Sequence, residues 1–142
     1  MYPQVNPYSL YGMMDEETFR PVYYDLLQQG VKYIYHNAIE NIGMFKLIPL
    51  KYRTDHIAYL GGLAVDPRFL SRGEGQKMLK RIISFVGEQG FLRIELSVAD
   101  SNDKAINLHK KNGFEKEGVL RKYSHLKSEG RLMDELMMSY IF

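Results

Sequence analysis

An apolar run that leads through a turn into a glycine-bearing helix start is the feature that most constrains the fold of this chain. Residues 57–65 form the run, residues 66–71 form the turn, and Arg72-Gly73-Glu74-Gly75 follows. Beyond the glycines, apolar residues recur at helical spacing, at Leu79, Ile82, Ile83 and Val86. This order predicts a strand, a loop and an amphipathic helix that packs back onto a sheet.

The start of that helix has the properties of an anion site. Backbone N–H groups in a first helical turn have no partner inside the helix, and the helix dipole favours negative charge there. Glycine at positions 73 and 75 would let a phosphate approach the backbone closely. Taken alone, the pattern is equally compatible with an ordinary surface turn into a helix.

Two common nucleotide motifs do not fit this segment. The pattern of a P-loop, with Gly-Lys-Ser/Thr after an earlier glycine, is absent from the chain. A dinucleotide fingerprint fits Gly73 and Gly75, and Glu95 lies at a suitable distance for a ribose-binding acid. Its third glycine would fall at Met78, and the loop after Val65 is too long for the usual tight turn.

A second motif lies downstream, after an alternating strand pattern at residues 92–98. It follows the form N-x-x-A-x-x-L-[Y]-x-K-x-G-F, carried by Asn102, Ala105, Leu108, His109, Lys111, Gly113 and Phe114. Together with V-D-P-x-x-x-x-R-G-x-G at residues 65–75, it resembles the GNAT superfamily of acyl-CoA-dependent N-acyltransferases. The resemblance covers roughly residues 43–142, and the segment from Gly113 onward is similar to members that acetylate primary amines.

The resemblance implies how acetyl-CoA would bind. Two central strands, here residues 56–65 and 92–98, would splay apart and admit the pantetheine arm. The implied cofactor contacts are the backbone of Leu63, Ala64 and Val65, the pyrophosphate loop of Arg72, Gly73, Glu74, Gly75, Gln76 and Lys77, and the side chain of Asn102. Asn102 also suits a helix N-cap, and both roles can coexist.

Two residues depart from the family pattern. Lys77 stands where a further glycine or alanine is usual, so it would either narrow the loop or add a cation near the phosphates. His109 stands where the family has a tyrosine beside the thioester sulfur. Histidine titrates near neutrality, so we expect His109 to assist departure of the thiolate; the alternative is a surface histidine without a role.

Attack by an amine also needs a base, because a protonated amine is not a nucleophile. Glu95 is the candidate, since strand alternation places Glu95 and Ser97 on one face of the strand and Ile94 on the other. A solvent-facing carboxylate without catalytic function is an equally good interpretation of Glu95.

Composition limits the remaining classes of protein. At 142 residues the chain suits a single domain over residues 1–142, with residues 1–12 as an irregular arm. A net charge of +2 does not favour nucleic-acid binding, and the absence of cysteine excludes disulfides and thiolate catalysis. We expect no metal site, no membrane span and, without a secretory signal pattern, a cytoplasmic protein.

The predicted order of elements gives an α/β fold with a mixed sheet and flanking helices, and the resemblance implies that this sheet is mostly antiparallel with splayed central strands. Helices are predicted from Asp15 and over residues 20–29, 76–89 and 103–111. Strands are predicted over residues 31–36, 42–52, 56–65, 92–98, 114–126 and 133–141.

The resemblance implies an enzyme that moves an acetyl group from acetyl-CoA to a small-molecule or peptide amine by direct attack. The alternative is a catalytically weak acyl-CoA-binding or regulatory domain that retains the fold. The apolar final strand and the tyrosine-bearing arm favour a homodimer, because a two-fold dimer is the commonest soluble oligomer. A monomer whose final strand pairs with residues 114–126 is the competing expectation.

Overall fold

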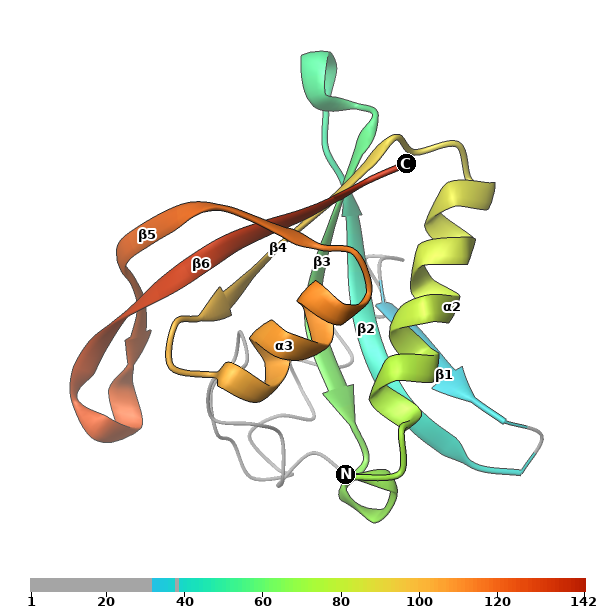
Figure 1. Ribbon diagram of the computed structural model, residues 1–142, viewed down its shortest axis with the longest axis horizontal. Helices are drawn as coiled ribbons and strands as arrows, with labels where there is room; N and C mark the ends of the chain where they lie inside the picture. Colours follow the sequence, from blue (N-terminus) through green and yellow to red (C-terminus); the bar gives the residue numbers. More distant parts are fainter. Residues whose placement is uncertain (1–31, 38) are drawn as a thin grey trace.

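Two helices cover one face of a six-stranded sheet in the computed structural model, which describes residues 32–37 and 39–142 (Figure 1). The strand order is β1-β2-β3-β4-β6-β5. The irregular arm at residues 1–12 and the helices predicted from Asp15 and over residues 20–29 lie outside the described residues.

The sheet is mixed and mostly antiparallel, as the sequence predicted. Its strands are β1 (Lys32–His36), β2 (Asn41–Pro49), β3 (Ile57–Val65), β4 (Arg93–Ala99), β5 (Glu115–Leu126) and β6 (Arg131–Ile141). Only β3 and β4 run parallel. Strand β2 ends at Pro49, before its predicted end at Tyr52, because Tyr52 has φ of 61° and opens a 3-10 turn.

The two helices that cover the sheet are α2 (Glu74–Glu88) and α3 (Asp103–Lys111). Helix α2 begins two residues earlier than predicted, because Gly73 adopts φ of 75° and turns the chain directly into the helix at Glu74. Helix α3 has the predicted bounds. Gly113 follows its end with φ of 95°, the left-handed conformation in which glycine commonly ends helices.

The hydrophobic core lies between the helices and the face of the sheet that they cover. Alternate strand residues supply one side and the apolar stripe of α2 supplies the other: Phe45, Leu47, Ala58, Leu60, Ile94, Leu96 and Val98 with Met78, Leu79, Ile82 and Val86. Ile106 of α3 and Phe114 close the core at the side of α3. Each large side chain buried here contributes roughly 1.5–3 kcal/mol, so the packing fixes both helices on the sheet.

The opposite side of the sheet, here called the far face, is polar near its centre. Alternation and strand register place Lys46, Tyr59, Glu95, Ser97 and Glu135 on it. The lysine stands on β2 and the two carboxylates stand on β4 and β6, and Arg93 of β4 forms an ion pair with Glu95 on this face.

Strands β3 and β4 pair over only part of their length. Ile57, Ala58 and Tyr59 pair with Arg93, Ile94 and Glu95, and the ladder then ends. We call this end point, at Tyr59 and Glu95, the fork. Figure 1 shows β4 turning away from β3 beyond it, with α3 lying over the diverging strands. The splay that the resemblance implied is therefore present.

A bulge in β3 lies just past the fork. Lys46 pairs with Gly61 and Met44 pairs with Ala64, so β3 carries one residue more than β2 over this stretch. Gly62 within the bulge has φ of 58°, a conformation that glycine tolerates best. The bulge changes the direction of the backbone of β3 where it no longer has β4 as a neighbour.

Candidate active site

The start of α2 presents free backbone donors. The first helical hydrogen bond runs from the Lys77 amide to the Gly73 carbonyl, at 3.2 Å. The amides of Glu74, Gly75 and Gln76 precede it and have no partner within the helix. The N-cap residue is Gly73, which has no side chain that could bond or cover these amides. An arrangement of free donors of this kind can hold a phosphate.

Gly75 shows which elements meet at this helix start. A Cβ atom on Gly75 would lie 3.6 Å from Leu108 Cδ2 of α3 and 4.0 Å from Val65 Cγ2 of β3. The structure thus brings together three predicted cofactor segments: the end of β3, the loop before α2, and α3. The edge of β3 from Leu60 to Val65 that faces β4 has no strand partner in the part of the chain described here.

The turn before this loop is held by Asp66. Its carboxylate accepts a hydrogen bond from the Arg68 amide at 2.9 Å and pairs with the Arg68 guanidinium at 3.0 Å. The hydrogen bond from the Arg68 side chain is the main reason that the pKa of Asp66 lies below its ordinary value. The Asp66 amide donates to the Ile42 carbonyl at 2.7 Å, which ties the turn to β2. Asp66 therefore fixes the entry to the loop.

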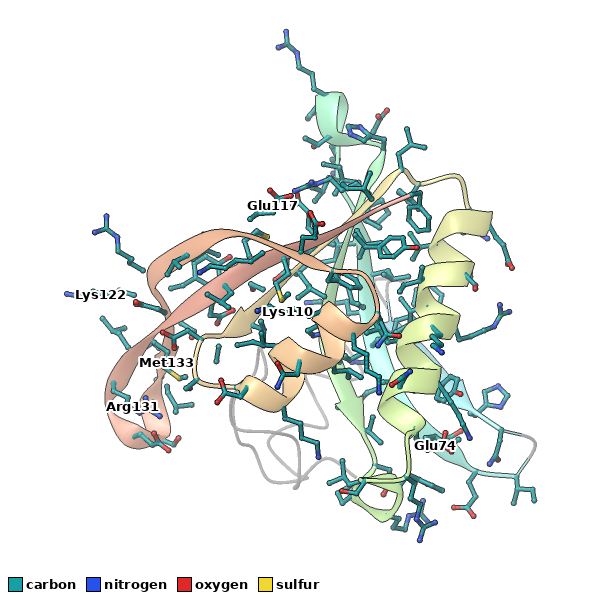
Figure 2. The ribbon with its side chains drawn as sticks, viewed as in Figure 1. Glu74, Lys110, Glu117, Lys122, Arg131 and Met133 are labelled. Atoms are coloured by element: carbon teal, nitrogen blue, oxygen red, sulfur yellow. The ribbon has the colours of Figure 1, made fainter. Side chains whose placement is uncertain are left out.

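The side chain of Lys77 lies away from α3. It lines a cleft of about 780 Å³ between β1 and α2, together with Tyr33, Tyr35 and Lys80. Its ammonium lies 3.6 Å from the carboxylate of Glu74, which Figure 2 labels at the start of α2. Lys77 therefore does not narrow the space between α2 and α3, and the Glu74 carboxylate partly balances its charge.

Asn102 is the N-cap of α3. Its Oδ1 accepts a hydrogen bond from the Ala105 amide at 3.2 Å, and its backbone carbonyl accepts from Ile106 at 3.0 Å. Capping engages the carbonyl oxygen of the side chain and leaves its NH₂ group as a donor. The structure is thus compatible with both roles expected of Asn102.

His109 lies inside the protein and not at its surface. The residue is 5% exposed, its ring packs 5.5 Å from the ring of Phe114, and Nδ1 is buried without a hydrogen-bond partner. Burial lowers the pKa of His109 from 6.5 to about 4. The imidazole is therefore neutral at pH 7, and as a donor it has one N–H group instead of an imidazolium proton.

Glu95 lies on the far face and is held by an ion pair. Its carboxylate accepts from Arg93 Nε at 3.1 Å, and Arg93 also bonds Glu117 at 2.9 Å. Ser139 donates to the same Glu117 carboxylate at 2.6 Å, and this bond, followed by Arg93, lowers the pKa of Glu117. Figure 2 labels Glu117 on β5. The structure does not bring Glu95 and His109 together, since α3 covers the other face of the sheet.

A hydroxyl pair at the fork was not singled out from the sequence. Tyr59 Oη lies 3.0 Å from Ser97 Oγ, so the bond joins β3 to β4 across the point where they separate. Burial is the main reason that the pKa of Tyr59 lies above its ordinary value of 10.0. The signal that could have revealed the pair is positional: parallel register and alternation put Tyr59, Glu95 and Ser97 on one face.

Among residues 32–37 and 39–142, no group of three or more His, Cys, Asp or Glu side chains is placed to hold a metal ion. Within the same residues, no helix has the length and apolar character needed to cross a membrane.

Known proteins with similar sequences and folds include N-acetyltransferases. The chain is 36% identical over 66 residues to the [ribosomal protein bS18]-alanine N-acetyltransferase of Salmonella typhimurium, covering 46% of this chain and 45% of that protein. It is 32% identical over 90 residues to the spermine/spermidine N(1)-acetyltransferase of Bacillus subtilis, covering 61% of this chain and 59% of that protein. The chain thus spans about half the length of these relatives.

A solved structure supports the fold independently. The ribosomal-protein-alanine N-acetyltransferase from Brucella melitensis superposes with a TM-score of 0.73 at 21% identity, over 93% of this chain and 82% of that one. The model of the acetyltransferase (GNAT) family matches residues 8–114, which is more than half of the chain. The chain belongs to the GNAT family of acetyltransferases.

Proposed function

We propose that this protein transfers an acetyl group from acetyl-CoA to a primary amine, by direct attack of the amine on the thioester. The observation that carries the proposal is the open start of α2 beside the unpaired edge of β3. Such a pair of features can hold a pyrophosphate at one end and an extended, amide-rich arm along the strand. Membership of the GNAT family and the names of the two relatives support an amine acceptor.

The residues fall into three groups in this proposal. The amides of Gly73, Glu74, Gly75 and Gln76, with Arg72, receive the pyrophosphate, whereas the Lys77 amide already donates to the Gly73 carbonyl. The backbone of Leu63, Ala64 and Val65 and the NH₂ group of Asn102 bond the pantetheine arm. An N–H on the unpaired edge of β3 stabilises the oxyanion that forms when the amine adds to the carbonyl.

The reaction needs one bond made and one broken. The neutral amine nitrogen forms the N–C bond, and the C–S bond then breaks, with its electron pair leaving on sulfur. The amine gives up one proton, and the thiolate takes up one from a donor or from water. We propose that His109 donates a hydrogen bond to the departing sulfur through its neutral imidazole, a weaker form of assistance than protonation by imidazolium.

Calorimetry with acetyl-CoA tests the binding site. Gly75→Glu should abolish binding, because it places a carboxylate among the amides that receive the pyrophosphate. Gly75→Ala should bind nearly normally, since its Cβ would make only ordinary contacts of 3.6 and 4.0 Å. Gly118→Glu is the matched control for added charge, because a Cβ there meets nothing within 4 Å. Unchanged affinity in Gly75→Glu would contradict the assignment.

Release of free thiol from acetyl-CoA across a panel of amines tests the activity. We expect turnover with at least one class among alkylamines, polyamines, amino acids and peptide N-termini. Tight binding of acetyl-CoA without turnover on the whole panel would contradict the enzyme and favour a binding or regulatory domain.

We further propose a single domain that acts in the cytoplasm as a homodimer. Within the described sheet, β6 pairs with β4 on one side and β5 on the other. Between Glu135 and Ser139, β6 has a strand on both edges, so this part of β6 offers no free edge with which to pair a second subunit. The dimer contact would then use side chains and not the terminal strand's backbone. Light scattering tests the dimer: a mass near 16.6 kDa would indicate a monomer, and a mass near twice that value would support the dimer.

A further inference from the structure

The hydroxyl pair of Tyr59 and Ser97 lies at the fork, on the far face of the sheet, and joins β3 to β4. Tyr59 is the last residue of β3 that pairs with β4, and its partner there is Glu95. Ser97 lies two residues beyond Glu95 on β4. Their oxygens are 3.0 Å apart. The bond therefore spans the opening between the strands on the side of the sheet that α2 and α3 leave uncovered.

Gly61 allows the Tyr59 ring to take this position. A Cβ atom on Gly61 would come within 3.2 Å of Tyr59 Cε1, a distance that neighbouring atoms rarely tolerate. The ring thus lies along β3 in the space that a side chain at position 61 would fill. This directs the hydroxyl toward the unpaired part of β3, where the proposed arm of acetyl-CoA would run.

A carboxylate stands on the same face. Glu135 of β6 is 9% exposed, and its register partner on β4 is Ala99, two residues beyond Ser97. Burial is the main cause of the raised pKa of Tyr59, and the charges of Tyr123 and Glu135 add to it. The phenol is therefore neutral at physiological pH. It can donate its proton to Ser97 Oγ and still accept a hydrogen bond on its own oxygen.

We infer that Tyr59 is the residue that receives the acceptor amine, with Ser97 as its positioning residue and Glu135 as the charge that favours a cationic acceptor. This inference rests on the proposed function. Acetyl-CoA would enter between α2 and α3, so the acceptor approaches from the far face. One N–H of the amine bonds Tyr59 Oη, and the lone pair of the nitrogen then points through the fork to the thioester carbonyl.

Glu95 is a weaker candidate for the same role. Its carboxylate is already bonded to Arg93 at 3.1 Å, and Arg93 links it to Glu117 and Ser139. Taking up an amine proton would neutralise this carboxylate and so weaken its ion pair with Arg93. Tyr59 keeps an unused acceptor while its bond to Ser97 stays intact, so it needs no rearrangement.

The test compares steady-state kinetics of purified variants on an amine that the parent acetylates. Tyr59→Phe should lower kcat/KM for the amine by about ten-fold to 100-fold, the effect of losing a hydrogen bond to a charged or reacting group. The KM for acetyl-CoA should stay unchanged. Ser97→Ala should lose part of the rate, and Ser97→Thr, which keeps the hydroxyl, should recover it.

Two further variants separate the role of the ring position and of the charge. Gly61→Ala keeps every hydroxyl but displaces the Tyr59 ring, so it should resemble Tyr59→Phe in its kinetics. Glu135→Gln should raise the KM of a cationic alkylamine several-fold and leave that of acetyl-CoA unchanged. Tyr52→Phe, at an 89% exposed tyrosine, is the control for loss of a phenolic hydroxyl.

The outcomes distinguish this inference from the proposed function. Parent-like kcat/KM in Tyr59→Phe, with an active parent, overturns the inference and leaves the enzyme in place. A rise in the KM for acetyl-CoA as large as that for the amine would also overturn it, because it indicates a structural defect. A parent that releases no thiol with any amine overturns the proposed function and this inference with it.

Discussion

Because His109 is buried, the free energy of unfolding of this protein should decrease at low pH. Replacement of His109 by a residue that does not titrate should remove that part of the decrease. The pKa of His109 is lowered from 6.5 to about 4 in the folded protein. As the pH falls, the unfolded chain therefore binds this proton first. The free energy of unfolding should decrease from about pH 6.5 to about pH 4 on this account, and no further below it.

The size of the effect follows from the two pKa values. Each pH unit between 6.5 and about 4 is worth ~1.4 kcal/mol, so the full loss of stability is about 3.5 kcal/mol, of which about 2.5 kcal/mol has occurred at pH 4.5. The positioning of the ring against Phe114 suits a replacement of similar shape. His109→Phe should keep the packing and remove the proton-binding group.

Urea unfolding of the parent and of His109→Phe, at pH 7.5 and at pH 4.5, measures the effect. The difference in unfolding free energy between the two proteins should shift by about 2.5 kcal/mol toward the variant at the lower pH. His125→Phe, at an exposed histidine, is the control for replacing a histidine by phenylalanine. Equal pH dependence in parent and His109→Phe would refute the reasoning, because His109 would then titrate as an exposed group.

Three other outcomes are expected. His109→Phe should lower turnover more than affinity for acetyl-CoA, and His109→Tyr should restore part of the loss; parent-like rates in both would remove His109 from the reaction. Asn102→Ala should cost about 1 kcal/mol in urea unfolding through loss of the N-cap, whereas Asn102→Asp, which keeps a capping oxygen, should cost less. Gly73→Ala should destabilise the fold by about 1 kcal/mol, because φ of 75° is unfavourable for alanine; a neutral result would show that the loop relaxes to another backbone conformation.

The elements that the sequence predicted well are those with a strong local signal. Helix α3 has an N-cap at Asn102 and a terminating glycine at 113, so its bounds follow from its ends. The apolar stripe of α2 and the alternation of β4 likewise fix the type and the buried face of each element. The mixed sheet followed from the order of the predicted elements, whereas its splay followed from the family resemblance.

The candidate site was predicted less completely, because its geometry depends on contacts between distant segments. Nothing in the sequence around His109 shows that Phe114 covers its ring, since helical spacing alone leaves that side of α3 undecided. Arg93 and Glu117 are far apart in sequence, so the ion pair that holds Glu95 was not visible either. The bond between Tyr59 and Ser97 likewise depends on a register that only the paired strands define.

The placement of β6 also bears on the order of events when this protein is made. Strand β6 leaves the ribosome after β4 and β5, yet in the finished sheet it lies between them. Until β6 arrives, β4 has a parallel neighbour over only three residue pairs and an open edge on its other side. The complete six-stranded sheet can therefore form only after Arg131–Ile141 has been synthesised. During that interval the apolar residues of β4 depend on α2, α3 or a chaperone for protection from aggregation.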